Sequence, residues 1–220
     1  MLFRKFMVSR EEGVIKYDRS GFHQTGPLPE PEYLGLERWR EKLFKLALIG
    51  EYEDLKVGYG NISELKNLSY LHHFDGPQFV ITGTQTGKFS HLTGEHYTQV
   101  VGHDVTNSLL TSYGPIEPSS EALTHAAIYL AATGVGAIFH IHSTPIWEGM
   151  IRENMDGTPE DIEYGTQEMA NCVSKLTAGK KASSFVMKGH QDGIIGYGTN
   201  LEDAGAEILK LYHKFVGQIP

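Results

Sequence analysis

Two histidines separated by a single residue have the clearest chemical potential in this sequence. His140 and His142 end the apolar run 136–142, which is typical of a short buried β-strand. Side chains alternate along a strand, so both imidazoles are expected on one face, with Cβ atoms roughly 6–7 Å apart and Ile141 in the core. That spacing allows both rings to bind one metal ion. Because the chain has 11 histidines, such a pair also arises by chance. The surrounding residues must therefore indicate whether this pair binds a metal ion.

A carboxylate and two serines precede this strand in the sequence. Glu121 lies in the first turn of a helix predicted over 118–133, which leads directly into the histidine strand. A carboxylate beside a divalent cation can bind the ion or accept a proton from carbon. The alternative is an acid that only favours the helix dipole. Ser119 and Ser120 lie where helix N-terminal amides can bind an anion.

Two glycine-bracketed loops and one loop between predicted strands complete the candidate set. Asn61 and the pair Thr86–Gly87 lie where the backbone can approach a phosphate closely, although ordinary turn chemistry explains such residues equally well. His190 and Asp192 lie between two predicted strands. An isolated histidine is usually a core or surface residue, but zinc sites commonly join two close ligands to a distant third.

The elements that must position these residues alternate between helical and strand periods. Helices are expected over 31–50, 118–133, 166–178 and from a capping box of Thr199 and Glu202 onward. Strands are expected over 58–64, 79–82, 136–142, 184–188 and 193–197. Residues 92–110 are expected to mix strand and loop, and residues 150–164 to form a loop. This alternation predicts helices layered around one sheet, with no repeat.

Length and composition limit the possible classes of protein. The 220 residues suit one domain, here expected over 31–220 and preceded by an N-terminal arm over 1–30 with a strand near 13–17. A net charge of -8 argues against nucleic acid as a partner, and a single cysteine, Cys172, excludes a disulfide scaffold. We find neither a signal peptide nor an apolar run long enough to span a membrane, so a cytoplasmic protein is expected.

In their order along the chain, the polar segments resemble the class II aldolase/adducin family, which includes fuculose-phosphate, rhamnulose-phosphate and ribulose-phosphate aldolases and epimerases. The resemblance spans about residues 35–215 and rests on Gly60-Asn-Ile-Ser63, Ile81-Thr-Gly-Thr-Gln-Thr-Gly87, Pro118-Ser-Ser-Glu121, His140-Ile-His142, Gly189-His-Gln-Asp-Gly193 and Gly198-Thr-Asn-Leu-Glu-Asp-Ala204. It implies a three-layer α/β/α fold with a mixed, largely antiparallel central sheet. It also implies a homotetramer with sites near subunit interfaces.

The resemblance further implies roles for individual residues. A divalent ion, typically zinc, would be held by His140, His142 and a third ligand, and Glu121 would bind the resting metal and act as the base. The substrate phosphate would be bound by Asn61, Thr86, Gly87, Ser119 and Ser120. The implied function is a metal-dependent lyase that cleaves a small phosphorylated sugar through a metal-stabilised enediolate.

The sequence departs from the family pattern at two places. Asp192 stands where the aldolases carry their third histidine, and His190 lies two residues earlier. We favour His190 as the third ligand, because an imidazole keeps the charge and softness of the site, with Asp192 as the rival ligand or as an orienting partner. The stretch in which the aldolases carry a proton-donating tyrosine is shorter here, and Tyr164 does not align with it. Two alternatives to the lyase therefore stay open. One is a ketose-phosphate dehydratase or epimerase on the same fold, and the other is a non-catalytic, adducin-like association module.

Overall fold

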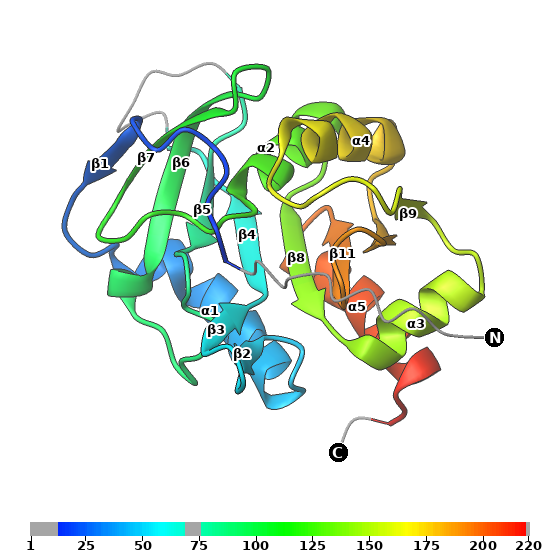
Figure 1. Cartoon of the computed structure of the whole chain (residues 1–220). Helices are drawn as coiled ribbons and strands as arrows, with labels where there is room; N and C mark the ends of the chain where they lie inside the picture. The colour runs from blue at the N-terminus through cyan, green and yellow to red at the C-terminus, as the bar shows by residue number, and fades with distance from the viewer. Residues whose placement is uncertain (1–12, 69–75, 219–220) are drawn as a thin grey trace.

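A nine-stranded mixed sheet forms the centre of the protein (Figure 1). The structure is a computed structural model, and it describes residues 13–68 and 76–218. The strand order is β1-β7-β6-β5-β4-β8-β11-β10-β9. β1 pairs with β7 and β9 pairs with β10 in parallel, and the other neighbours in this sheet are antiparallel. The strands are β1 (Phe22–Gln24), β4 (Asn61–Leu65), β5 (Phe79–Thr82), β6 (Tyr97–Asp104), β7 (Leu109–Gly114), β8 (Ala137–His142), β9 (Gly157–Thr158), β10 (Ser183–Met187) and β11 (Gly193–Gly198).

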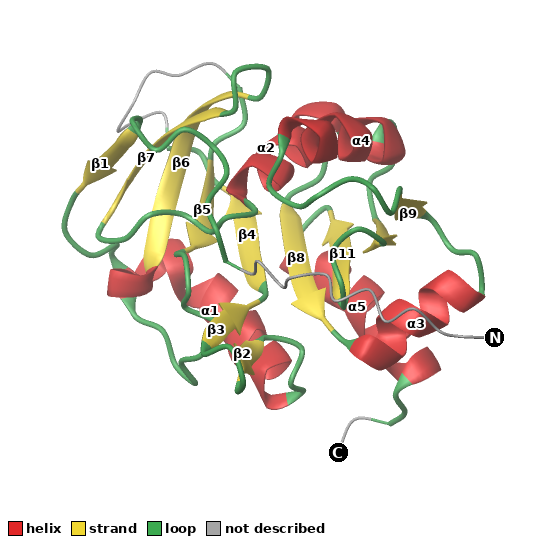
Figure 2. Ribbon diagram, viewed as in Figure 1, coloured by secondary structure: helices red, strands yellow, loops and turns green. Residues whose placement is uncertain are grey.

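Helices cover both faces of this sheet (Figure 2). One face carries α2 (Ala122–Ala131) and α4 (Gln167–Thr177), and the other carries α1 (Glu30–Lys45), α3 (Thr144–Arg152) and α5 (Leu201–Phe215). Alternation along β8 divides the core, because Ile138 packs on the α2/α4 side while Phe139 and Ile141 pack on the other side. The predicted three-layer α/β/α fold with a largely antiparallel sheet is therefore confirmed. Among the described residues, no helix is both long and apolar enough to cross a membrane.

A small hairpin lies outside the main sheet and leads into β4. Its strands are β2 (Gly50–Tyr52) and β3 (Val57–Tyr59), which pair antiparallel with Gly50 opposite Tyr59. Gly60 then turns the chain at φ +79°, a conformation that favours glycine. The hairpin is thereby set beside the start of β4.

Several predicted element boundaries are wrong, each for a local reason. The first helix ends at Lys45, and Ala47 at φ 54° turns the chain toward β2. The predicted loop 150–164 begins inside α3 and contains β9. The helix α3 was not predicted, although its N-cap Ser143 and Pro145 in its first turn are typical start signals.

The C-terminal helix is capped differently from the prediction. Asn200 is the N-cap of α5, and its side-chain oxygen accepts a hydrogen bond from the Asp203 amide at 2.9 Å. Thr199 instead donates its hydroxyl to the Asp203 carboxylate. The predicted capping box of Thr199 and Glu202 is therefore wrong by one residue.

The N-terminal segment contributes to the fold where it is described. Residues 1–12 of the expected arm lie outside the described residues. The strand expected near 13–17 is absent from that described segment, and β1 forms a few residues later. Tyr17 and Leu28 are both buried, one in the core on each side of the sheet.

Candidate functional site

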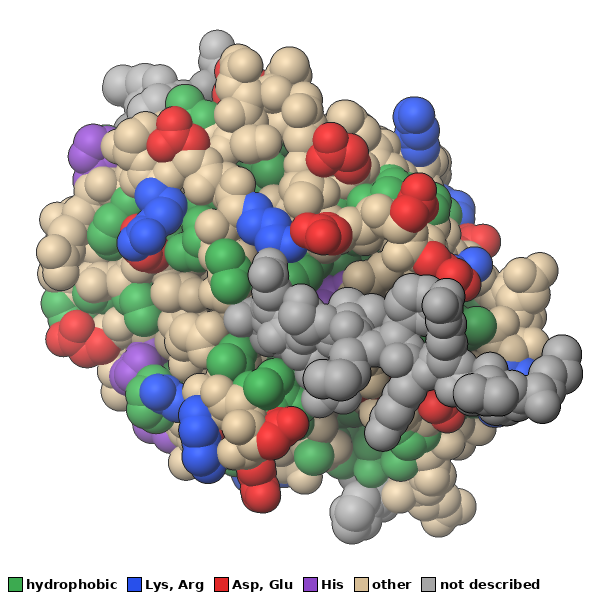
Figure 3. All heavy atoms as spheres, viewed as in Figure 1, with side chains coloured by type: hydrophobic (Ala, Val, Ile, Leu, Met, Phe, Trp, Pro, Cys, Tyr) green, Lys and Arg blue, Asp and Glu red, His purple; other side chains and the backbone are tan. Residues whose placement is uncertain are grey.

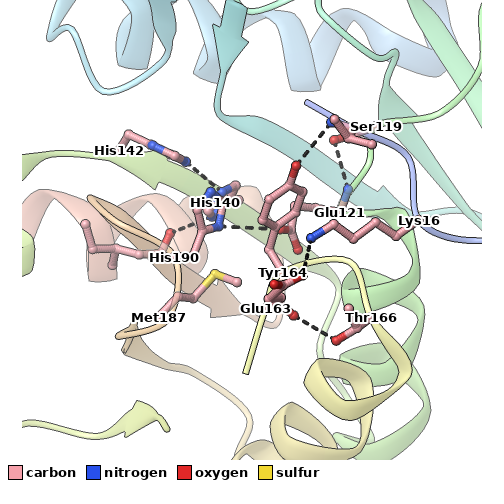
Figure 4. Close-up of polar contacts among 12 residues, drawn as sticks. Lys16, Ser119, Glu121, His140, His142, Glu163, Tyr164, Thr166, Met187 and His190 are labelled. Atoms are coloured by element: carbon pink, nitrogen blue, oxygen red, sulfur yellow. Dashed lines mark hydrogen bonds and ion pairs between the residues drawn. The ribbon is translucent and has the colours of Figure 1, made fainter. Parts of the chain in front are cut away.

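Three buried imidazoles meet at one end of β8 (Figure 4). His140 and His142 come from β8, and His190 comes from the turn between β10 and β11. One ring nitrogen from each lies within 4.8 Å of the others, and the two Nε2 atoms of the β8 pair are 3.0 Å apart. All three side chains are at most 4% exposed. The predicted convergence of two strand histidines with a distant third is thus the geometry of this site.

Sheet pairing explains why the third imidazole reaches the other two. β11 pairs with β8 so that Gly193 lies opposite His142. The preceding turn is tight, because the His190 amide donates to the Met187 carbonyl at 3.1 Å and the Gly193 amide donates to the His190 carbonyl at 3.0 Å. A turn closed in this way brings the His190 ring to centroid distances of 5.1 Å from His140 and 4.7 Å from His142.

The environment of His140 favours a neutral ring with its lone pair on Nε2. Burial lowers the pKa of His140 well below its usual value, and the positive charge that His190 can carry adds to this effect. Its Nδ1 lies 3.2 Å from the Ile194 carbonyl, which can only accept a hydrogen bond. The proton therefore belongs on Nδ1, and Nε2 is left to bind a metal ion.

Tyrosines contact the other two imidazoles, and none of these tyrosines is among the predicted site residues. The Tyr52 hydroxyl lies 2.7 Å from His142 Nδ1, while the Tyr59 ring stacks on His142 with centroids 5.3 Å apart. Tyr164 stacks on His190 at 4.5 Å, and its hydroxyl accepts a hydrogen bond from the Val14 amide at 3.1 Å. Tyr59 lies inside the glycine-bracketed segment 58–60 and Tyr52 precedes it, so this segment is the local signal that could have indicated Tyr59.

Glu121 lies beside the imidazoles and does not cap the helix with its side chain. It occupies the N-cap position of α2, one residue before the first turn in which it was expected, and makes no side-chain cap bond. Its Oε1 is 3.5 Å from His190 Nδ1, and the residue is 2% exposed. The Ser119 hydroxyl accepts the Glu121 amide at 3.3 Å. The serine thus fixes the backbone that places this carboxylate at the site.

A cavity of about 350 Å³, including space open to solvent, joins the imidazoles to the glycine-bracketed loops. Its wall includes the residues predicted to bind substrate, which are Asn61, Thr86, Gly87, Ser119 and Ser120, together with Glu121, His140, His142 and His190. The side-chain oxygen of Asn61 is buried and has no hydrogen-bond partner among the described residues. A buried polar atom of this kind is costly unless a ligand or water satisfies it.

Thr86 and Gly87 also have structural roles in their loop. The Thr86 hydroxyl donates to the Gly83 carbonyl at 2.8 Å, so only its oxygen lone pairs and its main chain face a ligand. A Cβ on Gly87 would lie 2.6 Å from the Gly50 carbonyl oxygen and would also overlap that of Tyr59. Glycine is therefore needed at position 87 for the loop to pack on the hairpin.

Asp192 lies on the other side of His142 from this cavity. It lines a second cavity of about 610 Å³, again including open space, together with Tyr52, Tyr59 and His142. Within the described ranges, it is not among the residues whose ligand atoms cluster with the two β8 imidazoles. Its φ of 65° places it in the left-handed region, which Asp adopts more readily than most residues. The geometry thus groups His190, and not Asp192, with the histidine pair.

The histidine-bearing region opens on one face of the molecule. Figure 3 shows a hollow near the centre of this face in which a histidine side chain is visible. Acidic and basic side chains are interspersed around it. Near the imidazoles, Lys16 and Glu163 form an ion pair at 2.8 Å, and the Lys16 ammonium lies 4.2 Å from the centroid of the Tyr164 ring, which stacks on His190.

Comparison with known proteins gives the family context of this geometry. The family described as Class II Aldolase and Adducin N-terminal domain matches residues 47–147. A search of curated proteins finds no match.

Solved structures share the fold at low identity. YgbL from Escherichia coli, a candidate aldolase/epimerase/decarboxylase, is 18% identical, with 83% of this chain and 86% of that chain covered and a TM-score of 0.61. An L-fuculose 1-phosphate aldolase is 17% identical, with 85% and 84% covered and a TM-score of 0.59. The L-fuculose-1-phosphate aldolase of Thermus thermophilus is 18% identical, with 86% and 89% covered and a TM-score of 0.56. The family match over residues 47–147 and the shared fold confirm the resemblance to class II aldolase/adducin proteins that the ordered motifs predicted.

Proposed function

We propose that the protein is a metal-dependent lyase that cleaves a carbon–carbon bond in a small phosphorylated sugar. The observation that carries this proposal is the cluster of three buried imidazoles beside Glu121, on the wall of a cavity otherwise lined by hydroxyl, amide and main-chain groups. Three imidazoles and a nearby carboxylate suit a divalent ion, zinc above all. His140, His142 and His190 would hold it, with Asp192 as the rival third ligand. When bound, such an ion supplies Lewis-acid polarisation of a carbonyl group.

Glu121 is proposed as the base. Its carboxylate lines the same cavity as the three imidazoles, so a substrate carbon held in that cavity against Glu121 would be within reach of proton transfer. Burial at 2% exposure also keeps bulk water away from this proton.

The five polar residues of the loops are proposed to bind the substrate phosphate. The described residues of the cavity wall include no lysine or arginine. Recognition would therefore depend on hydroxyl groups and main-chain amides, which bind phosphate in many glycine-rich loops. Asn61 fits this role, because its side-chain amide is buried at 6% exposure with an unsatisfied oxygen and can be oriented either way.

Two alternatives remain as second candidates. A dehydratase or epimerase on a ketose phosphate would use the same ligands and base, and the YgbL fold relative carries a description that includes epimerase. A non-catalytic, adducin-like association module would need none of the buried ionisable groups. The cluster of imidazoles favours an enzyme over this module.

The test begins with elemental analysis of untagged protein freed of chelator. We expect about one zinc or similar ion per chain, followed by aldehyde release from a phosphorylated ketose in a coupled assay. Protein that neither contains nor takes up zinc, manganese or cobalt would contradict the proposal and favour the association module. Bound metal with isomerised but uncleaved ketose would favour the epimerase instead.

We also propose that the protein is a cytoplasmic homotetramer in which residues 1–30 form an arm on the domain of residues 31–220. The family resemblance supports the tetramer. Analytical ultracentrifugation tests it, and a monomer at micromolar concentration would contradict it.

A further inference from the structure

The hairpin β2–β3 places two tyrosines against one metal-ligand candidate. Tyr52 and Tyr59 lie on the same face of the hairpin, with ring centroids 4.6 Å apart. Gly50 makes room for this arrangement, since a Cβ there would lie 2.7 Å from the Tyr59 hydroxyl oxygen. Both rings contact His142, Tyr59 by stacking and Tyr52 through its edge at a centroid distance of 5.9 Å.

The proton of His142 must lie on Nδ1 for its Nε2 to bind the same ion as His140. The two Nε2 atoms face each other at 3.0 Å, and the His140 proton is already held on Nδ1 by the Ile194 carbonyl. A neutral imidazole has one N–H and one lone pair, so the group that faces His142 Nδ1 decides which nitrogen binds metal.

The group that faces His142 Nδ1 is the Tyr52 hydroxyl, at 2.7 Å. A hydroxyl can donate or accept, so by itself it leaves the tautomer open. The same hydroxyl lies 3.5 Å from Asp192 Oδ2, and an ionised carboxylate can only accept. When Tyr52 donates to Asp192, its oxygen lone pairs are left to accept the proton of His142 Nδ1.

We propose that Tyr52 and Asp192 form a hydrogen-bonded relay that holds the His142 proton on Nδ1 and thereby turns its Nε2 lone pair toward His140. Both are positioning residues, and the inference rests on the proposed metal centre. In this relay Asp192, which stands where the aldolases carry their third histidine, orients a metal ligand and does not itself bind the ion. The left-handed backbone of Asp192, together with the Ser143 amide that donates to its carbonyl at 2.9 Å, fixes where this carboxylate lies.

The experiment measures zinc affinity by competition with a chromophoric chelator, in the absence of substrate. We expect Tyr52→Phe to bind zinc about 10–100-fold more weakly than the wild type, the usual effect of removing a partner of a ligating histidine. Asp192→Asn keeps the shape and tolerates the backbone, but its amide can donate to Tyr52 and permit the wrong tautomer. The double variant should bind no more weakly than Tyr52→Phe alone, because the two residues act in series.

Tyr59→Phe is the matched control. It keeps the stacked ring and loses a hydroxyl that donates to the Ala47 carbonyl at 3.4 Å, away from His142 Nδ1. Its zinc affinity should remain within about twofold of the wild type. Urea denaturation in chelator checks that each variant is folded. Wild-type affinity in both Tyr52→Phe and Asp192→Asn, or additive losses in the double variant, would overturn the relay.

A second readout identifies the ligating nitrogen directly. Nitrogen-15 spectra of histidine-labelled, zinc-loaded protein distinguish the two tautomers, and His142→Asn identifies the signals of residue 142. We expect the Nδ1–H form in the wild type and in Tyr59→Phe, and a mixture in Tyr52→Phe. An Nε2–H form in the wild type would overturn the inference. Wild-type protein that binds no zinc would overturn both the metal centre and the relay, whereas tight zinc binding without lyase activity would contradict only the proposed function.

Discussion

The imidazole of His125 should make the stability of the protein depend on pH, and the size of the effect follows from its surroundings. His125 lies in α2, is completely buried, and places Nδ1 2.7 Å from the Ser63 hydroxyl, which also contacts the Tyr129 hydroxyl at 2.9 Å. Its Nε2 has no partner among the described residues. Burial therefore disfavours the charged form and lowers the pKa of His125 from 6.5 to about 3.

The lowered pKa fixes the direction of the effect. Between about pH 6.5 and pH 3 the unfolded chain binds a proton at this residue and the folded chain does not, so the free energy of unfolding decreases as the pH falls. The contribution is fully present above about pH 6.5. At pH 5 the loss amounts to about 2 kcal/mol relative to pH 8, which corresponds to about 4–8 °C in Tm for a chain of this size.

The assay compares the wild type with His125→Asn by urea denaturation at pH 8 and pH 5, with chelator present so that metal release does not contribute. The asparagine side chain places a polar atom near the position of Nδ1, can keep the bond to Ser63, and cannot titrate in this range. Truncation costs stability at both pH values, but the wild type should lose about 2 kcal/mol more than the variant between them. Equal losses in the two proteins would refute a neutral, buried His125.

Three further outcomes are expected. His140→Ala should lose stoichiometric metal with the fold retained, because only two imidazoles remain; equilibrium dialysis against zinc measures this, and a full equivalent of bound ion would contradict it. Glu121→Gln should keep metal but lose about 10²–10⁴-fold in turnover, since an amide cannot take up the proton; unchanged kcat would remove Glu121 from the mechanism. Gly87→Ala should lower the free energy of unfolding by about 1–3 kcal/mol, because its methyl group would overlap the Tyr59 carbonyl. Gly26→Ala is its control, with no atom within 4 Å of the added Cβ, and equal stability of the two variants would show that the loop adjusts freely.

The sequence was informative where one local period determines the geometry. Alternation along a strand is independent of the rest of the fold, so it was enough to place His140 and His142 on one face and Ile141 on the other. The alternation of helical and strand periods predicted helices layered around one sheet, and the family resemblance implied that this sheet is largely antiparallel. Helix starts were less certain: several residues around 199–203 can act as caps, and Asn200 was selected by the position of α5 against the sheet.

The remaining parts of the site depend on contacts that no local period determines. The preference for His190 over Asp192 rests on ligand chemistry alone: the segment is a closed turn with Asp192 at φ 65°, so strand alternation does not apply to it. Tyr52 and Tyr59 were not indicated because their hairpin lies outside the main sheet. Their contact with His142 arises only when β4 pairs with β8.

The distribution of polar groups in this fold bears on the choice between an enzyme and an association module. His140, His142, His190 and Glu121 are each at most 4% exposed. Burial of ionisable groups is costly, and well-packed apolar residues of similar volume are often equally stable or more stable. A module that used the fold only for association would be as stable or more stable with apolar residues in place of these groups at the end of β8. The same side chains instead converge within hydrogen-bonding or ligand distance of one another beside a cavity. Natural proteins cluster buried ionisable groups in this way chiefly at functional sites. Metal content is therefore the measurement that separates an enzyme from an association module.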